Sequence, residues 1–249
     1  IGIGGGLWST GKAMAIYMIE HQSLIRKNVQ NLQQYQDACT CTCQKETSQE
    51  EMDGGVDNGI KTLELGSGNG LLSICLAAVA QDLIGKLVVT DLEDHLELME
   101  KTVRANPHIV NLDADNDDNT HEENQGEEKG SSKSSTNSIN SRRRPRTLVK
   151  EHRWGEFETE EKDDEKFDFI IGSDVAYRDY LHEPLVRTLV HYSHPGTIAL
   201  IGVTMIDTKP KFFHLLKENG FSYQRIPDEQ MSPEFRGTTF GLFVIQRVH

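Results

Sequence analysis

Short apolar segments alternate with longer amphipathic segments along most of this chain. The short segments have the pattern of buried β-strands, and they are residues 61–65, 86–91, 147–154, 167–175 and 197–205. The longer ones have apolar side chains at helical spacing, and they are residues 12–25, 71–83, 92–106, 180–193 and 211–220. This alternation predicts a mostly parallel sheet with helices on both faces.

The last two apolar segments break the alternation. Residues 221–227 and 238–248 both read as strands, and no helical pattern separates them. They predict a hairpin that brings one antiparallel strand into the sheet. The whole chain, residues 1–249, is therefore expected to form a single α/β domain with a Rossmann-like, seven-stranded sheet.

Two polar segments interrupt this pattern. Residues 33–58 and 111–146 contain few apolar side chains, and the second segment is rich in Asp, Glu and Ser before it ends in RRRPR. Such compositions bury too little apolar surface to offset the entropy of ordering. We expect two disordered inserts, and we expect deletion of residues 111–146 to preserve the fold because loop closure depends only weakly on loop length.

The overall composition limits the possible partners. The 249 residues carry a formal net charge of −13, which disfavours a general nucleic-acid binder. No run of 18 apolar residues occurs, and no signal-peptide pattern is visible. We expect a cytoplasmic protein without a membrane segment, and the Arg run at residues 142–146 is also compatible with a nuclear address.

The four cysteines do not indicate a metal site. Cys39, Cys41 and Cys43 alternate with other residues, whereas zinc sites use C-x-x-C pairs. These three are expected to be loop thiols in a reducing compartment, and Cys75 is expected to be a small buried hydrophobic residue.

The stretch GLWSTGKA, residues 6–13, approaches the Walker A phosphate-binding pattern. Its last position is Ala13, which lacks the hydroxyl that would ligate Mg²⁺. The preceding IGIGG is also a poor strand. A nucleotide hydrolase is therefore disfavoured.

A glycine-rich loop, GSGNG at residues 66–70, joins the first strand to a helix. Its glycines allow the backbone to approach a ligand closely. The dinucleotide fingerprint G-x-G-x-x-G would require glycine at position 71, which is leucine. A ligand loop is favoured over an ordinary turn, and a dehydrogenase is disfavoured.

Polar and aromatic residues follow the next three strands. Asp91 lies 21 positions after Gly70 and could accept the hydroxyls of a ribose, or it could cap a helix. Trp154 could cover an adenine ring or pack in the core. Asp174 and Tyr177 could form a polar wall of a site, with a helix cap and rim packing as the alternatives.

These segments together resemble a known group of enzymes. ELGSGNG, VVTDLEDHLELMEKTVRAN, EHRWGE and FDFIIGSDVAY are similar to the seven-β-strand S-adenosylmethionine-dependent methyltransferases. Within this group the chain resembles the protein-lysine branch, methyltransferase family 16, over nearly its whole length apart from the polar inserts. The glycine loop is shared by many methyltransferases, whereas the Trp, the Asp-x-x-Tyr and the leading GLW are more specific to the branch.

The resemblance implies roles for particular residues. Those implied to bind the cofactor S-adenosyl-L-methionine are Trp8, Glu64, Gly66, Ser67, Gly68, Gly70, Asp91, Trp154 and Ser173. Asp174 and Tyr177 would face the methyl group and the acceptor. No metal is implied. The implied activity is methylation of a lysine in a protein, such as a chaperone, an AAA ATPase or a translation factor, by a monomeric enzyme.

The residues by themselves leave other functions possible. A small-molecule methyltransferase and a non-catalytic module with the same fold are the main alternatives. A nucleic-acid amine methyltransferase is disfavoured because Val175 and Ala176 stand where that group carries two prolines.

Overall fold

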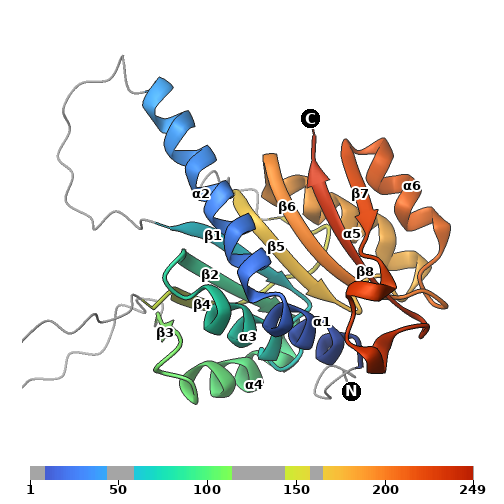
Figure 1. Ribbon diagram of the computed structural model, residues 1–249, viewed down its shortest axis with the longest axis horizontal. Coiled ribbons are helices and arrows are strands. Elements are labelled where there is room, and N and C mark those ends of the chain that lie inside the picture. Colours follow the sequence, from blue (N-terminus) through green and yellow to red (C-terminus); the bar gives the residue numbers. More distant parts are fainter. Residues whose placement is uncertain (1–8, 44–58, 114–143, 158–164, 249) are drawn as a thin grey trace, which may run out of the picture.

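The computed structural model describes residues 9–43, 59–113, 144–157 and 165–248. Its centre is an eight-stranded sheet with the strand order β3-β4-β2-β1-β5-β6-β8-β7 (Figure 1). The strands are β1 Ile60–Leu65, β2 Ile84–Asp91, β3 Asn111–Leu112, β4 Arg146–Glu151, β5 Phe167–Ser173, β6 Ser193–Thr204, β7 Phe221–Arg225 and β8 Phe240–Arg247. Among these strands only β8 runs antiparallel to its neighbours, β6 and β7. The predicted single antiparallel strand is therefore confirmed.

Helices cover both faces of this sheet. They are α1 Ser9–Glu20, α2 Gln22–Cys43, α3 Leu71–Ala80, α4 Glu93–Arg104, α5 Asp179–Tyr192 and α6 Pro210–Glu218, with short 3-10 turns η1 Asp228–Gln230 and η2 Pro233–Phe235. Buried side chains of α1 to α4 belong to one apolar cluster, and those of α5 and α6 belong to a second. The central strand β5 is buried along nearly its whole length, as expected of a parallel strand covered on both faces.

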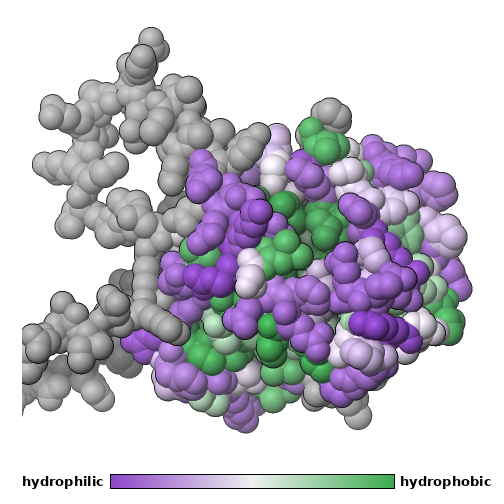
Figure 2. Space-filling model, viewed as in Figure 1, coloured by the Kyte–Doolittle hydropathy of each residue, from purple (hydrophilic) through white to green (hydrophobic). Residues whose placement is uncertain are grey.

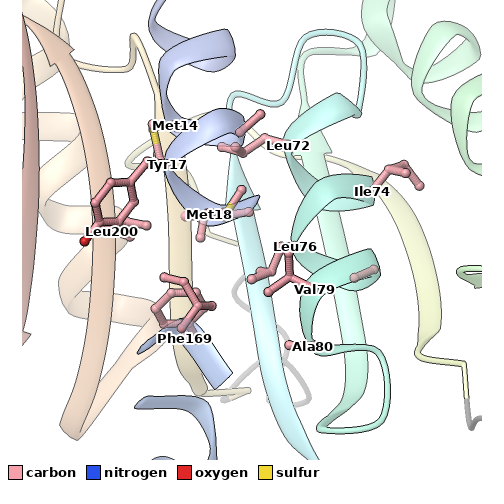
Figure 3. Close-up of a cluster of buried hydrophobic side chains, with 14 of the residues drawn as sticks. Met14, Tyr17, Met18, Leu72, Ile74, Leu76, Val79, Ala80, Phe169 and Leu200 are labelled. Atoms are coloured by element: carbon pink, nitrogen blue, oxygen red, sulfur yellow. The ribbon is translucent and has the colours of Figure 1, made fainter. Parts of the chain in front are cut away.

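The first cluster joins α1 and α3 to the sheet. Figure 3 shows Met18 of α1 on the side toward Leu76 of α3, Met14 farther along α1 on the side toward β6, and Phe169 of β5 below them. All four side chains are at most 4% exposed. The packing fixes α1 at the end of the sheet where the arrowheads of the parallel strands lie (Figure 1).

The outer face over α1 and α2 is mixed in character. Figure 2 shows separate green apolar patches that are surrounded by purple hydrophilic side chains. This is the usual surface of a domain face in contact with water. None of the described helices is long and apolar enough to cross a membrane.

The predicted insert at residues 33–58 is wrong at its start, because α2 continues to Cys43. Residues 22–43 contain neither glycine nor proline and are rich in Gln, a good helix former, which favours the helix despite its low hydrophobicity. The backbone of Cys39, Cys41 and Cys43 is therefore helical rather than a loop, and residues 44–58 lie outside the described part. Cys75, on α3, is half-buried rather than fully buried.

The predicted insert at residues 111–146 is wrong at both ends, and this accounts for the eighth strand. Asn111–Leu112 forms β3, which pairs in parallel with the start of β4. Two side chains at the end of the insert also bind its beginning: Arg144 donates to the Pro107 carbonyl, and Arg146 pairs with Asp113. A two-residue strand is too short to show a periodic pattern. Residues 114–143 lie outside the described part.

Several further element boundaries differ from the prediction, among them the start of β6, which is at Ser193 rather than at residue 197. The segment 12–25 is divided at His21, where α1 ends and α2 begins. The third predicted strand, 147–154, stops at Glu151, because a turn follows in which the Glu156 N–H donates to the Arg153 carbonyl at 3.1 Å. Trp154 therefore lies in a turn and not at the end of a strand.

Candidate functional site

A cavity of about 900 Å³ opens beyond the carboxyl ends of the parallel strands. The chain leaves β1 toward β2 and β4 on one side, and it returns to β5 on the other. In open α/β sheets, ligands bind at such a reversal of strand order. The volume is within the range of small-molecule sites, which is about 300–1,000 Å³.

The glycine loop forms the floor of this cavity. Gly66 and Gly68 have φ values of 63°, and Gly70 has a φ of 80°, in the left-handed region that glycine adopts easily. A Cβ atom on Gly66 would lie 3.0 Å from the Trp154 ring. Gly66, Ser67 and Gly68 line the cavity, whereas Gly70 turns the chain into α3 and is not among the lining residues.

Glu64 lies behind the glycine loop and does not line the cavity. It is 1% exposed, and its carboxylate accepts hydrogen bonds from the Ser73 N–H at 3.1 Å and from the Ser73 hydroxyl. Burial raises the pKa of Glu64 to about 7, the Ser73 and Ser67 hydroxyls oppose the shift, and the nearby Asp91 charge adds to it. At this position Glu64 braces the start of α3 through Ser73, and the cofactor contact that the resemblance implies stays a prediction.

This burial of Glu64 predicts a pH-dependent stability. Because its pKa rises from 4.5 to about 7 on folding, the folded state binds the proton more tightly than the unfolded state. The stabilisation is present below pH 4.5 and is lost as the pH rises through 7. Relative to Glu64→Gln, the wild type should lose about 3 kcal/mol of unfolding free energy between these limits.

Chemical denaturation of both proteins across that pH range measures the difference. Glu218→Gln on α6, which removes an exposed carboxylate, is the matched control for the chemical change. A constant difference between wild type and Glu64→Gln would show that the buried carboxyl does not titrate with a raised pKa.

Asp91 ties the end of β2 to the glycine loop. One carboxylate oxygen accepts the Gly68 N–H at 2.7 Å, and the other accepts the Leu92 N–H at 2.7 Å. The His95 Nδ1 atom lies 3.3 Å from the second oxygen. The N-cap residue of α4 is Leu92, so Asp91 does not occupy the capping position that was its alternative. Its carboxylate instead lines the cavity beside the loop.

Trp154 both faces the cavity and packs against apolar side chains. It lines the cavity opposite Gly66, and it is partly buried against the second apolar cluster. The neighbouring Gly155 N–H donates to the Thr188 hydroxyl of α5 at 2.8 Å. The turn is thus fixed to α5, and the indole is held beside the loop.

Asp174 is the one non-glycine residue with positive φ in the described part of the chain, at 56°. Its N–H donates to the Gly202 carbonyl at 2.9 Å, and its carboxylate accepts the Thr204 hydroxyl at 2.9 Å. The N-cap residue of α5 is Arg178, so Asp174 is not the helix cap. A strained residue held by its surroundings is typical of a functional site.

The turn that follows Asp174 is held from two directions. The Ala176 carbonyl accepts His182 Nε2 and the Thr208 hydroxyl, each at 3.1 Å. Both donors are buried. This arrangement fixes Asp174 and Tyr177 relative to each other, and both line the cavity.

Tyr177 is a neutral phenol in this setting. Burial, followed by the neighbouring Tyr180, raises its pKa above the ordinary value of 10.0. The Arg178 guanidinium lies 5.9 Å from the centre of its ring. The side chain can therefore orient a ligand or offer a ring face, and it stays protonated at neutral pH.

The start of α1 reaches the same cavity. Ser9 and Gly11 line it, and a Cβ atom on Gly11 would lie 3.3 Å from the Ser173 hydroxyl. Ser173 also lines the cavity, as expected. Trp8 lies outside the described residues.

The cavity also contains residues that the sequence analysis missed. The clearest are Thr204, the last residue of β6, Asp207, three positions later, and Tyr180 at the start of α5. The strand-end rule that indicated Asp91 and Asp174 would also have found Thr204 and Asp207 if it had been applied to the fifth strand. His95 and His152 carried no comparable signal.

Comparison with known proteins decides the family. The sequence model of a family described as lysine methyltransferase matches residues 1–131, slightly more than half of the chain. This chain belongs to that family. The predicted membership of the protein-lysine branch is confirmed.

A related curated protein is consistent with this membership. Protein N-lysine methyltransferase METTL21A of Mus musculus is 25% identical over 170 residues, which are 68% of this chain and 60% of the relative. The chain therefore spans less than two thirds of the length of that relative.

The chain is also similar to solved structures of methyltransferases. The CurJ carbon methyltransferase aligns with a TM-score of 0.51 and 12% identity, over 79% of this chain and 50% of its own. A ribosomal protein L11 methylase from Lactobacillus delbrueckii subsp. bulgaricus has a TM-score of 0.48 and 14% identity, over 78% and 73% of the two chains. At 12% identity, the first match establishes the shared architecture alone.

Membership of the family implies S-adenosyl-L-methionine as the cofactor, and the cavity has the features that this group requires. The Cβ-free Gly66 leaves room for a ligand beside the loop and Trp154. The Asp91 carboxylate at the cavity wall is suited to a pair of hydroxyl groups, and the Trp154 indole is suited to an adenine ring. These donors and shapes fit the nucleoside part of the cofactor.

Proposed function

We propose that this protein methylates a lysine side chain of a protein substrate with S-adenosyl-L-methionine as the methyl donor. The observation that carries the proposal is the fixed turn of Asp174 and Tyr177, which lines the same cavity as the glycine loop and Asp91. The site thus combines a place for the cofactor with an acidic and aromatic wall for the acceptor. Membership of the lysine methyltransferase family supports the same reaction.

The residues divide into two groups along the cavity. Gly66, Ser67 and Gly68 would lie against the methionine part of the cofactor, and Asp91 would accept the ribose hydroxyls. Trp154 would cover the adenine, and Ser173 would complete the pocket beside α1. When bound, the cofactor supplies an electrophilic methyl group on a positively charged sulfonium.

The acceptor end must bind a cation and release a neutral amine. A lysine has an ordinary pKa near 10.4, so it arrives protonated and must lose a proton before it can act as a nucleophile. The Asp174 carboxylate can attract the ammonium and accept its proton, directly or through water. Enclosure by Tyr177 and Val175 further favours the neutral amine, because desolvation lowers the pKa of a lysine.

Positioning is the other contribution of this turn. Asp174 is held by Thr204 and by the Gly202 carbonyl, so its carboxylate does not have to be ordered when the acceptor binds. The phenol of Tyr177 can orient the amine, and its ring can stabilise a neighbouring cation. Holding the reacting groups in line accounts for a large share of the rate of such a displacement.

Thermal unfolding with separate ligands tests the cofactor assignment. S-adenosylmethionine and S-adenosylhomocysteine should raise the melting temperature, and ATP–Mg²⁺ and NAD should not. A ligand at 100 times its dissociation constant stabilises the folded state by about 2.7 kcal/mol, which is readily detected. Stabilisation by ATP–Mg²⁺ would instead favour phosphate binding by residues 6–13, and no shift with any ligand would favour a non-catalytic module.

Transfer of a tritium-labelled methyl group to proteins of a cell lysate tests the acceptor class. We propose acceptors of the kinds that the family modifies, namely chaperones, AAA ATPases and translation factors, and a monomeric enzyme that acts in the cytoplasm and the nucleus. The net charge of −13 supports a basic, lysine-bearing acceptor. Label in small molecules and none in protein would favour the small-molecule alternative.

A further inference from the structure

Exposed apolar side chains gather at the mouth of the cavity. Among the large apolar residues that the structure describes as exposed, Tyr180 and Ile206 are the most exposed, at 73% and 66%. Tyr180 lines the cavity, and Ile206 immediately precedes Asp207, which lines it too. Exposed apolar side chains beside a cavity offer apolar contact area to a partner that enters it.

The turn that carries Ile206 and Asp207 is fixed in place. The Asp207 N–H and the Thr208 N–H both donate to the Thr204 carbonyl, at 3.0 and 2.9 Å. The Met205 N–H donates to the Thr239 carbonyl at 2.7 Å. The backbone of this turn is therefore already ordered, and a partner that binds to it pays little entropy for its ordering.

The charges at this end of the cavity complement a lysine. Asp207 is exposed, and Asp174 is half-buried in the same cavity. The Arg178 guanidinium also lines this end, but it lies over the Tyr177 ring. A lysine side chain has an ammonium for the carboxylates and an apolar stem for the Tyr177 ring.

We propose that Tyr180, Ile206 and Asp207 form the entrance that selects the acceptor. This inference rests on the proposed function. The occupant is an extended protein segment that carries the target lysine next to an apolar side chain. Asp207 attracts the incoming ammonium, Tyr180 and Ile206 hold the apolar neighbour, and Asp174 receives the amine at the reacting end.

Short synthetic peptides test this entrance. Each peptide carries one central lysine in a Gly/Ser background, with a single neighbouring position occupied by Ser, Leu or Glu. We expect the Leu peptides to be methylated with a KM about tenfold lower than the Ser peptides, the effect of one good apolar anchor. The Glu peptides should have the highest KM, because Asp207 and Asp174 repel them. Equal KM values for the three peptides, or methylation of free lysine as efficient as that of the peptides, would overturn the proposal.

Variants identify the residues responsible. Tyr180→Ala and Ile206→Ser should each raise the KM of the Leu peptide about tenfold with kcat unchanged, and should leave the Ser peptide nearly unaffected. Ile19→Ser is the matched control, because Ile19 on α1 is 53% exposed and is not a cavity-lining residue. An equal effect of the control, or an unchanged KM in both entrance variants, contradicts the assignment.

Asp207→Asn separates the charge from the apolar contacts. It should raise the KM of the Ser and Leu peptides about fivefold at low salt, the upper end for an exposed ion pair. The difference from the wild type should disappear at high salt because exposed charges are screened. The control Glu218→Gln removes an exposed charge on α6 and should have no effect. A salt-independent loss would show that Asp207 acts through structure rather than charge.

The inference and the proposed function fail in different ways. If lysate proteins are labelled and the peptides are not, recognition is not local to a short segment, and the entrance proposal falls while the lysine methyltransferase activity stands. If S-adenosylhomocysteine binds but neither lysates nor peptides are labelled, both proposals fall.

Discussion

Replacing Asp174 with Asn or Ala is expected to reduce methyl transfer by at least about 100-fold, in the range of a lost general base. The Asp174 carboxylate lines the cavity and is held at 2.9 Å by the Thr204 hydroxyl. Asn is the sharper substitution, because it keeps the shape, tolerates the φ of 56° and removes only the charge. The measurement is the rate at which tritiated methyl groups are transferred to lysate proteins at a saturating concentration of the cofactor.

Cofactor binding should survive this change. The groups expected at the nucleoside, Asp91 and Trp154, lie on other elements of the cavity. The dissociation constant of S-adenosylhomocysteine, measured by calorimetry, should therefore stay within about threefold of the wild-type value. A threefold change corresponds to less than about 1 kcal/mol of binding free energy. Asp179→Asn, an exposed acid at the start of α5 that is not among the lining residues, is the control and should retain full activity. Turnover of Asp174→Asn within a few fold of the wild type would remove Asp174 from the catalytic machinery.

Phe212→Ala is expected to lower the free energy of unfolding by about 3–5 kcal/mol, the usual cost of truncating a fully buried phenylalanine. Phe212 is 1% exposed and is among the largest fully buried side chains. Its ring centre lies 5.7 Å from that of His182 and 5.3 Å from that of Phe213. The substitution leaves a cavity between α5, α6 and the sheet, and the rigid surroundings can close it only in part.

Denaturant unfolding monitored by circular dichroism measures this loss. Tyr180→Ala is the matched control, because it removes an aromatic ring that is 73% exposed, and its effect should stay within about 0.5 kcal/mol. A loss below about 1 kcal/mol for Phe212→Ala would mean that this core collapses around the missing ring.

His182 connects the buried Phe212 to the turn that carries Asp174. This buried histidine packs on Phe212 and donates to the Ala176 carbonyl within the turn that carries Asp174 and Tyr177. The packing of α5 on α6 therefore also determines where the acceptor end of the cavity lies. A stability loss at Phe212 should lower the temperature at which methyl transfer is retained, whereas Asp174→Asn changes the rate and leaves that temperature unchanged.

Several features of the site were predictable from local patterns. The segments that became β1, β2 and β5 are short, predominantly apolar and followed by polar or glycine residues, so their carboxyl ends could be read from the sequence. The rule that ligands bind beyond those ends then indicated the glycine loop, Asp91 and Asp174, and the cavity contains all three. The two final strands without an intervening helix likewise predicted the reversal at β8.

Other features depended on contacts between distant parts of the chain. The two-residue β3 exists only because it pairs with β4 more than thirty positions later. Glu64 belongs to the glycine motif, yet the side-chain alternation of β1 turns it away from the cavity and toward Ser73 of α3. The clamp of His182 and Thr208 on Ala176 comes from two other elements and has no signature of its own.

The features that could be predicted depend on local burial, and the others depend on how the elements pack together. Apolar periodicity reports how each segment is buried, and burial is a local property of the sequence. The packing of the elements decides which side chain reaches a given carbonyl. It also decides that Asp207 lines the cavity whereas Glu64 is buried in the core. The sequence alone therefore established the mostly parallel sheet, its reversal and the edge at which the cavity lies, whereas the bracing of the loop, the fixed Asp174 turn and the place of Asp207 at the cavity were decided by tertiary packing.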